Sequence, residues 1–216
     1  MEKLRKWLPS LLIFAVLLAS VAAGAAYGKY IFGKAFTGTV TLNANLGSIT
    51  LLESKANPNG DGSYTLDKTT PVTGNTYQII PGLDIPKDPY VTIKNKSSIP
   101  VYVFVEVSTN MNESKHFIEY TLTNDWKLLS NNTETGVSVY YYTAGGEHAA
   151  TVDNTFGTDG TGTIQILQAD SNGNSLIVSQ KLNAPITGIY LNFKALMGQV
   201  ITTGEAAQTV YERITA

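Results

Sequence analysis

The amino-acid sequence predicts an all-β protein, a jelly-roll-like β-sandwich of about ten short strands followed by a short C-terminal helix. From Phe36 onward, short alternating or apolar runs are separated by Gly, Asn, Asp and Pro, a pattern typical of strands joined by tight turns. Only 15% of the residues are charged, while Thr, Asn, Gly and Tyr are plentiful. A chain of 216 residues suits one such domain, and no internal segment has the composition of a linker, so residues 29–216 are expected to form a single sandwich.

The expected strands are short runs rich in β-branched and aromatic residues. They are Phe36–Asn43, Ser48–Leu52, Thr76–Ile80, Tyr90–Lys94, Val101–Ser108, Phe117–Thr123, Val137–Thr143, Thr163–Gln168, Leu176–Lys181 and Thr187–Phe193. The segment Ile99–Val107 has such residues on both faces, which predicts a central strand covered on both sides. Asn57–Gly62 and the Asn172-Gly173 pair predict tight turns, and Gly204–Arg213 predicts the C-terminal helix.

Charge and cysteine content exclude several classes of function. The formal net charge is -2, and the charged residues are scattered along the chain, so nothing indicates a nucleic-acid partner. The chain has no cysteine, which excludes disulfides, thiolate catalysis and cysteine-based metal sites. Its stability must therefore come from burial of apolar side chains and from backbone pairing.

The chain begins with the pattern of an export signal. Lys3, Arg5 and Lys6 form a positive n-region, and residues 8–26 form an apolar stretch that ends among small residues. This pattern predicts a signal peptide over residues 1–28. Because the apolar stretch is also about long enough to span a bilayer, an uncleaved membrane anchor is the alternative. In both cases the positive residues precede the span, which places the body outside the membrane, secreted or held at the cell surface.

No catalytic motif is present in the sequence. A metalloenzyme needs at least three protein ligands, and a nucleophilic enzyme needs an activated side chain beside a base. The only histidines are His116 and His148, and neither an HExxH pair nor a GxSxG elbow occurs. We therefore expect no enzymatic activity, no catalytic residue and no bound metal or cofactor.

Two Asx-rich loops, Asn57–Gly62 and Asp170–Asn174, imitate the opening of a calcium-binding loop. The twelfth position, where a bidentate Glu belongs, is Lys68 in the first loop and Lys181 in the second. Turns without a metal are therefore favoured, and calcium binding is the alternative. Acceptor sequons for N-glycosylation, usable in a host that performs it, occur at Asn95, Asn112 and Asn131.

Aromatic residues near the middle of the chain are a candidate platform for carbohydrate. The rings of Trp126 and of Tyr140–Tyr142 could stack on the apolar face of a sugar. Successive residues of a strand point to opposite faces, however, so Tyr141 is expected to point away from its two neighbours. Packing in the core or at an interface is the favoured interpretation, and a sugar site is the alternative.

Several segments share a pattern that covers most of the chain. They are Phe36–Leu42 after the signal segment, the Pro81-Gly82 turn leading to Lys87–Asn95, Tyr102–Val105, Asp125-Trp126, Tyr140–Tyr142, and Phe193–Gln199 followed by Gly204–Ala207. Together they resemble the TasA/camelysin family of exported proteins from Gram-positive bacteria, which a SipW-type signal peptidase processes. The resemblance implies a jelly-roll sandwich at the cell surface or in the biofilm matrix. It also implies that subunits can polymerise when the N-terminal strand of one completes the sheet of the next.

Strand donation has a plain physical basis. An open sheet edge presents unpaired N–H and C=O groups, and an extended segment of another chain can pair with them. Residues 29–42 follow the predicted cleavage site and mix aromatic and β-branched residues with glycines, so they are a possible donor strand. The candidate assembly residues are Tyr30, Phe32, Phe36, Val40 and Leu42. The alternative is that this stretch is an ordinary first strand of its own sandwich.

The sequence thus favours an exported structural protein of the cell surface or biofilm matrix that assembles into fibres through strand donation. Its expected partners are other copies of the chain, an export signal peptidase and a cell-surface or matrix polysaccharide. A secreted binding module for carbohydrate or a host protein is the alternative, and a metal-dependent protease is the least favoured hypothesis.

Overall fold

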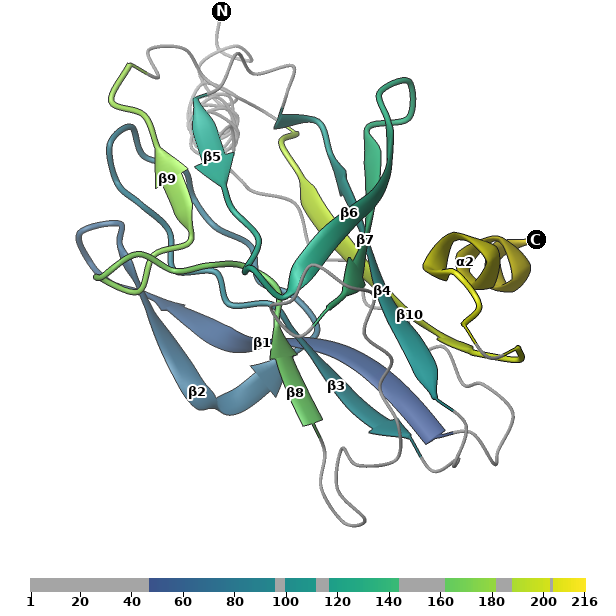
Figure 1. Cartoon of the computed structure of the whole chain (residues 1–216). Coiled ribbons are helices and arrows are strands. Elements are labelled where there is room, and N and C mark those ends of the chain that lie inside the picture. Colours follow the sequence, from purple (N-terminus) through teal and green to yellow (C-terminus); the bar gives the residue numbers. More distant parts are fainter. Residues whose placement is uncertain (1–46, 96–99, 112–116, 144–161, 182–187, 203) are drawn as a thin grey trace, which may run out of the picture.

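The computed structural model of the chain describes residues 47–95, 100–111, 117–143, 162–181, 188–202 and 204–216 (Figure 1). The predicted signal segment and the predicted first strand, Phe36–Asn43, lie outside these ranges. Within them the chain is mostly β, its paired strands run antiparallel, and its C-terminal end forms a short helix. The all-β prediction is confirmed.

The described strands form two four-stranded sheets and one two-stranded sheet. In spatial order, the first sheet contains β2 (Tyr64–Val72), β1 (Gly47–Pro58), β3 (Tyr90–Asn95) and β8 (Gly162–Gln165). The second contains β10 (Leu191–Gln199), β4 (Val101–Thr109), β7 (Val137–Tyr142) and β6 (Trp126–Asn132). The small sheet pairs β5 (Ile118–Tyr120) with β9 (Leu176–Val178).

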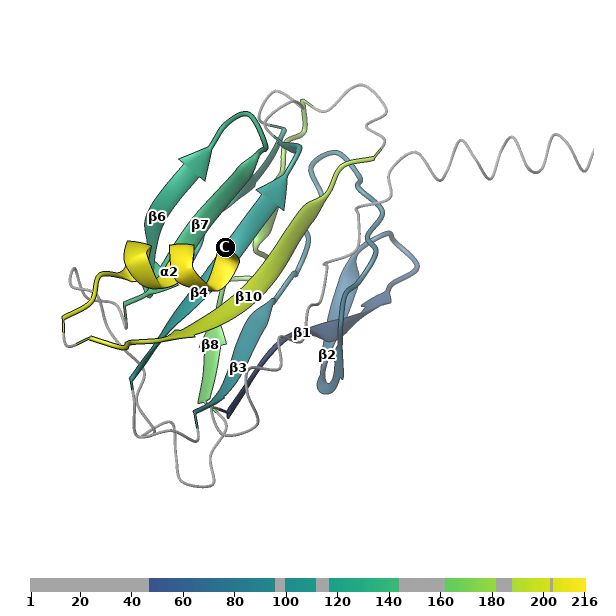
Figure 2. The ribbon, with the colours of Figure 1, turned by 90° about the vertical axis from the view of Figure 1, so that its right-hand side faces the viewer.

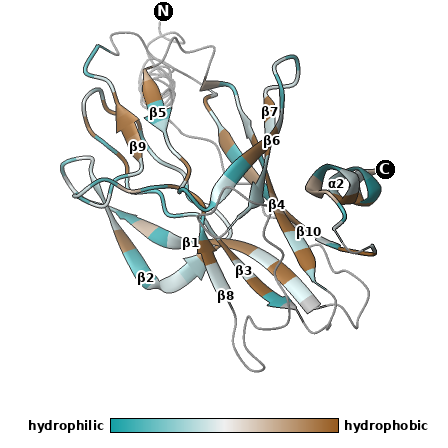
Figure 3. Ribbon diagram, viewed as in Figure 1, coloured by the Kyte–Doolittle hydropathy of each residue, from teal (hydrophilic) through white to brown (hydrophobic). Residues whose placement is uncertain are grey.

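The two larger sheets enclose a common apolar core. Ile49 of β1 and Val91 of β3 meet Val103 of β4 and Phe193 of β10 there, and each of these side chains is at most 1% exposed. The hydropathy colouring of Figure 3 shows hydrophobic segments along β3, β4 and β10. Burial of this surface is the main favourable term in folding, because the chain has no covalent cross-link through cysteine.

The strand β4 is buried on both faces, as its sequence predicts. Val101, Val103 and Val105 point into the main core, whereas Tyr102 and Phe104 belong to a second apolar cluster on the opposite face. Strand β4 is paired along its whole length with β10 and over part of its length with β7, so it lies inside its sheet. Continuous burial on both faces explains its unbroken run of β-branched and aromatic residues.

The helix α2 (Ala207–Thr215) covers the outer face of the second sheet, where Figure 2 shows it lying across β4 and β10. Val210 of the helix is fully buried in the second cluster. Gly198 of β10 permits this close approach, since a Cβ atom at this position would overlap the Cγ1 atom of Val210. The Tyr102 hydroxyl donates to the Glu205 carbonyl at 3.0 Å and fastens the loop that leads into the helix.

Several predicted elements need correction. Thr76–Ile80 is not a strand; Tyr77 and Ile79 are buried from an irregular connection between β2 and β3. The strands β2 and β6 were not predicted, because their many polar side chains are typical of loops. The closing strand lies later than the predicted Thr187–Phe193, at β10, and the helix begins three residues after Gly204.

None of the helical residues within the described ranges forms a span of the length and hydropathy that a bilayer crossing requires. The apolar stretch over residues 8–26 is not part of those ranges.

The close approach at Gly198 generates a prediction for stability. Gly198→Ala should lower the free energy of unfolding by about 1–3 kcal/mol, because the new methyl group pushes Val210 and α2 away from β10. Gly60→Ala is the matched control, since no atom lies within 4 Å of a Cβ built there. Urea unfolding followed by circular dichroism measures both variants. Equal midpoints would show that α2 does not depend on this contact.

Candidate functional site

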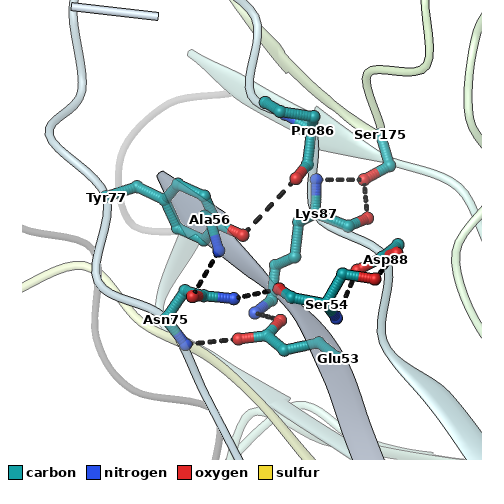
Figure 4. Close-up of polar contacts among 9 residues, drawn as sticks. All are labelled: Glu53, Ser54, Ala56, Asn75, Tyr77, Pro86, Lys87, Asp88 and Ser175. Carbon is teal, nitrogen blue, oxygen red and sulfur yellow. Dashed lines mark hydrogen bonds and ion pairs between the residues drawn. The ribbon is translucent and has the colours of Figure 1, made fainter. Parts of the chain in front are cut away.

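A buried ion pair connects β1 to the segment before β3. The Lys87 ammonium lies 2.5 Å from Oε2 of Glu53, and both side chains are at most 1% exposed (Figure 4). The nitrogen also lies 5.6 Å from the centre of the Tyr77 ring, within the range of a cation–π contact. Burying two opposite charges carries a large desolvation penalty, so the surrounding hydrogen bonds decide whether the arrangement is tolerated.

The backbone around Glu53 is shaped by Asn75. The register between β1 and β2 shifts between Ser54 and Lys55, because residues 68–70 of β2 bulge out of the ladder. The Asn75 carboxamide binds β1 at this shift: Nδ2 donates to the Ser54 carbonyl and Oδ1 accepts from the Ala56 amide, each at 2.8 Å. The backbone amide of Asn75 donates to Oε1 of Glu53. Asn75 thus fastens this part of β1 with its side chain and anchors the Glu53 carboxylate with its backbone amide.

Hydrogen bonds of its backbone to Ser175 hold Lys87 in position. Its amide donates to Oγ of Ser175 at 3.1 Å, and the Ser175 hydroxyl donates to the Lys87 carbonyl. The next residue, Asp88, accepts from the Ser54 amide at 2.9 Å and from the Ser54 hydroxyl at 2.6 Å. These bonds join β1, the segment before β3 and the hairpin that leads to β9, so the lysine stem enters the core in a fixed direction.

The electrostatics of this centre affect the neighbouring tyrosine. Burial raises the pKa of the Tyr77 hydroxyl well above its usual range, and the negative charges of Glu53 and Asp88 add to this rise. Tyr77 is therefore a neutral phenol at any ordinary pH. Its hydroxyl donates to the Pro86 carbonyl at 3.4 Å.

A surface pocket of about 660 Å³ borders this centre. Its walls come from β2, from the Pro86–Asp88 segment and from the hairpin at Asn172–Asn174, and they include Tyr64 and Lys68. The volume falls within the range of small-molecule sites. Lys87 is one of the pocket's lining residues, but its side chain is fully buried and its ammonium lies against Glu53.

The open edges of the two large sheets are the second candidate site. Among the described strands, β2, β8, β6 and β10 each have a ladder partner on one side only. Strand β8 has four residues, and β2 and β6 carry mostly exposed or half-buried side chains. Strand β10 has nine residues, most of them buried. Asn192 of β10 also has a buried Oδ1 atom with no hydrogen-bond partner within the described part of the chain.

No protein-family model, no curated protein and no solved structure matches the chain. Its resemblance to the TasA/camelysin family therefore rests on its own residues.

The predicted assembly residues, Tyr30, Phe32, Phe36, Val40 and Leu42, lie outside the described residues. The same holds for His116 and His148, and for the sequon at Asn112. The sequon residue Asn131 is exposed on β6. Across the described ranges, no group of three or more His, Asp or Glu side chains is close enough to hold a metal ion.

Both calcium-like loops are β-turns closed by their own carboxylates. Oδ1 of Asp61 accepts from the amide and the hydroxyl of Ser63, and these bonds lower the pKa of the Asp61 carboxyl. Oδ1 of Asp170 accepts from the amides of Asn172 and Asn174, each at 2.8 Å. Hydrogen bonds of this kind are typical of Asx turns.

The aromatic platform is packed into the fold. Tyr141 lies in the cluster under α2, while Tyr140 and Tyr142 pack against the main core, as the alternation along β7 predicts. Trp126 is 7% exposed, contacts Tyr142 edge-on and donates from Nε1 to the Gln165 carbonyl at 2.8 Å. These rings stabilise the junction between the two sheets.

The Glu53–Lys87 ion pair was not predicted from the sequence, although the alternation along β1 indicates that Glu53 is buried. Ile49, Leu51 and Glu53 occupy every second position of β1, so Glu53 follows two core residues on the same face. A carboxylate on an apolar face indicates a buried partner. Nothing in the local sequence identifies Lys87 as that partner, because the contact spans 34 residues.

The ion pair predicts that removal of a buried lysine costs more stability than removal of an exposed one. Lys87→Met should lower the free energy of unfolding by about 3–5 kcal/mol, because the Glu53 carboxylate is left buried without its cation. Lys194→Met is the matched control: its ammonium is 45% exposed and lies 3.2 Å from Glu106, so its loss should cost less than about 1 kcal/mol. Chemical denaturation of both variants measures the difference. Similar losses would contradict the assigned role of Lys87.

Proposed function

We propose that this chain is an exported structural protein of the cell surface or biofilm matrix, whose subunits assemble into fibres by β-strand donation. The N-terminal pattern of positive residues and an apolar stretch supports export. The family resemblance of the body supports a structural role and a jelly-roll arrangement of the strands. The absence of any catalytic motif in the sequence agrees with a role other than catalysis.

The observation that carries the assembly proposal is the edge of β10. An incoming strand gains most from an edge that is long and continuous with an apolar core. Of the described edge strands, β10 best meets this condition, because it has nine residues and contributes Phe193 and Met197 to the core. The unpartnered Oδ1 of Asn192 would receive a donor from an added strand.

The donor in this proposal is the segment 29–42, with Tyr30, Phe32, Phe36, Val40 and Leu42 as its assembly residues. It precedes β1 directly in the sequence and has the alternation of a strand. Removal of the signal peptide would free its N-terminal end. An alternative is a secreted module that binds carbohydrate or a host protein; the surface pocket lined by Lys68 and Asn172 favours it.

The cysteine-free chain allows a clean cross-linking test. Cysteine is placed in turn at Phe36, Gly38 and Val40, and each is combined with Asn192→Cys on β10. Paired strands bring opposed Cα atoms within about 4.5–5.5 Å, a separation that a disulfide can bridge. Under mild oxidation we expect a ladder of covalent oligomers on non-reducing gels from at least one combination.

The matched control replaces Asn192→Cys with Asn131→Cys on the β6 edge, which should give no ladder. Electron microscopy of the unmodified mature protein should show filaments that disappear when residues 29–42 are deleted. A disulfide that forms only within one monomer would show that the segment is an ordinary first strand. A persistent monomer that binds polysaccharide would favour the binding module.

A further inference from the structure

The Lys87 ammonium has more hydrogen-bond donors than the described residues around it have acceptors. It carries three N–H donors, and among the residues that the structure describes it has one hydrogen-bond acceptor, Oε2 of Glu53. The side chain is fully buried. The nearby Tyr77 ring offers only a cation–π contact. A buried cation with unsatisfied donors is costly, and a group with a single N–H would suit this position better.

Asn75 is bonded to the same carboxylate through its backbone. One oxygen of Glu53 accepts from the backbone amide of Asn75, and the other accepts from Lys87. Figure 4 shows the Lys87 ammonium and the backbone nitrogen of Asn75 bonded to the two oxygens of Glu53. The carboxamide cannot rotate freely, because Ser54 and Ala56 hold its two ends at 2.8 Å. One carboxylate thus holds Lys87 by its ammonium and Asn75 by its backbone amide, while β1 fixes the Asn75 carboxamide in place.

We propose that Lys87 and Asn75 join through a spontaneous isopeptide bond, with Glu53 as the proton carrier. The Glu53 carboxylate first takes one proton from the Lys87 ammonium along their hydrogen bond. The neutral amine then attacks Cγ of Asn75, and the new Nζ–Cγ bond replaces the Cγ–Nδ2 bond. Glu53 passes its proton to Nδ2, which leaves as ammonia, and accepts the second proton of Nζ. The step needs no oxidant, water or cofactor.

The surroundings favour this reaction in two ways. The Ala56 amide donates to Oδ1 of Asn75, where negative charge develops when the amine attacks. Fixed neighbours also react far faster than the same groups free in solution, because the entropy of bringing them together has been lost on folding. The product amide has one N–H for the one acceptor that Glu53 offers, so the mismatch at Lys87 disappears.

The bond would stabilise the fold where the ladder between β1 and β2 is interrupted. It would connect the irregular segment after β2 to the segment before β3, across the part of β1 where the ladder is interrupted. A cross-link that closes a loop reduces the freedom of the unfolded chain, as a disulfide does. This chain has no cysteine to serve that purpose. The proposal does not depend on fibre formation, since it concerns the interior of one subunit.

Peptide mapping of the full chain, purified and unfolded before trypsin digestion, tests the bond. Without it, trypsin cuts after Lys87 and releases two peptides, 69–87 and 88–94. With it, Lys87 is blocked, and we expect one peptide, 69–94. Its mass should be about 17 Da, one ammonia, below that of the same uncleaved peptide without the bond. Fragment spectra should place the link between Asn75 and Lys87.

Glu53→Gln and Asn75→Ala should abolish the linked peptide, whereas Lys181→Arg, which removes an exposed amine, should leave it in place. Two full-mass peptides from the unmodified chain would overturn the proposal, and this result does not require any variant to fold. Loss of ammonia from peptide 69–87 with normal cleavage at Lys87 would overturn it as well, because it indicates cyclisation of Asn75 alone. A linked peptide in Glu53→Gln would contradict the role of Glu53.

Discussion

The packing of two apolar sheet faces against each other is the interaction on which the rest of the structure depends. Side chains of β1 and β3 meet those of β4 and β10 in one core, and the chain has no disulfide to replace that burial. A sandwich of this kind buries its faces but leaves its edges unpaired. The same constraint that holds the domain together therefore also leaves the open edges through which the proposed assembly would occur.

Patterns produced by core burial could be predicted from the sequence, whereas pairings over long distances could not. The double-faced run around Val103 predicted β4, and the alternation at Tyr140–Tyr142 predicted that Tyr141 points away from its two neighbours. Strands β2 and β6 were missed because a polar edge strand looks like a loop when its neighbours are unknown. Tyr77 and Ile79 were assigned to a strand because a buried irregular segment is as apolar as a strand.

The Glu53–Lys87 centre illustrates the same limit for a site. The position of Glu53 on a core face was visible in the alternation of β1, but its partners come from two other segments of the chain. Asn75 gives no local signal, since its role arises from the interrupted ladder between β1 and β2. Only the assembled fold shows that one carboxylate holds an amine and an amide together.

Hydrogen exchange of the monomer and of the assembled fibre, followed by mass spectrometry, tests the central claim most directly. The account predicts that amides of β10 (Leu191–Gln199) exchange more slowly in the fibre than in the monomer, because an added strand pairs with the open edge. Amides of β4, already paired on both sides, should change little, and so should those of β6. Fibres in which β10 exchanges as fast as in the monomer would contradict the account.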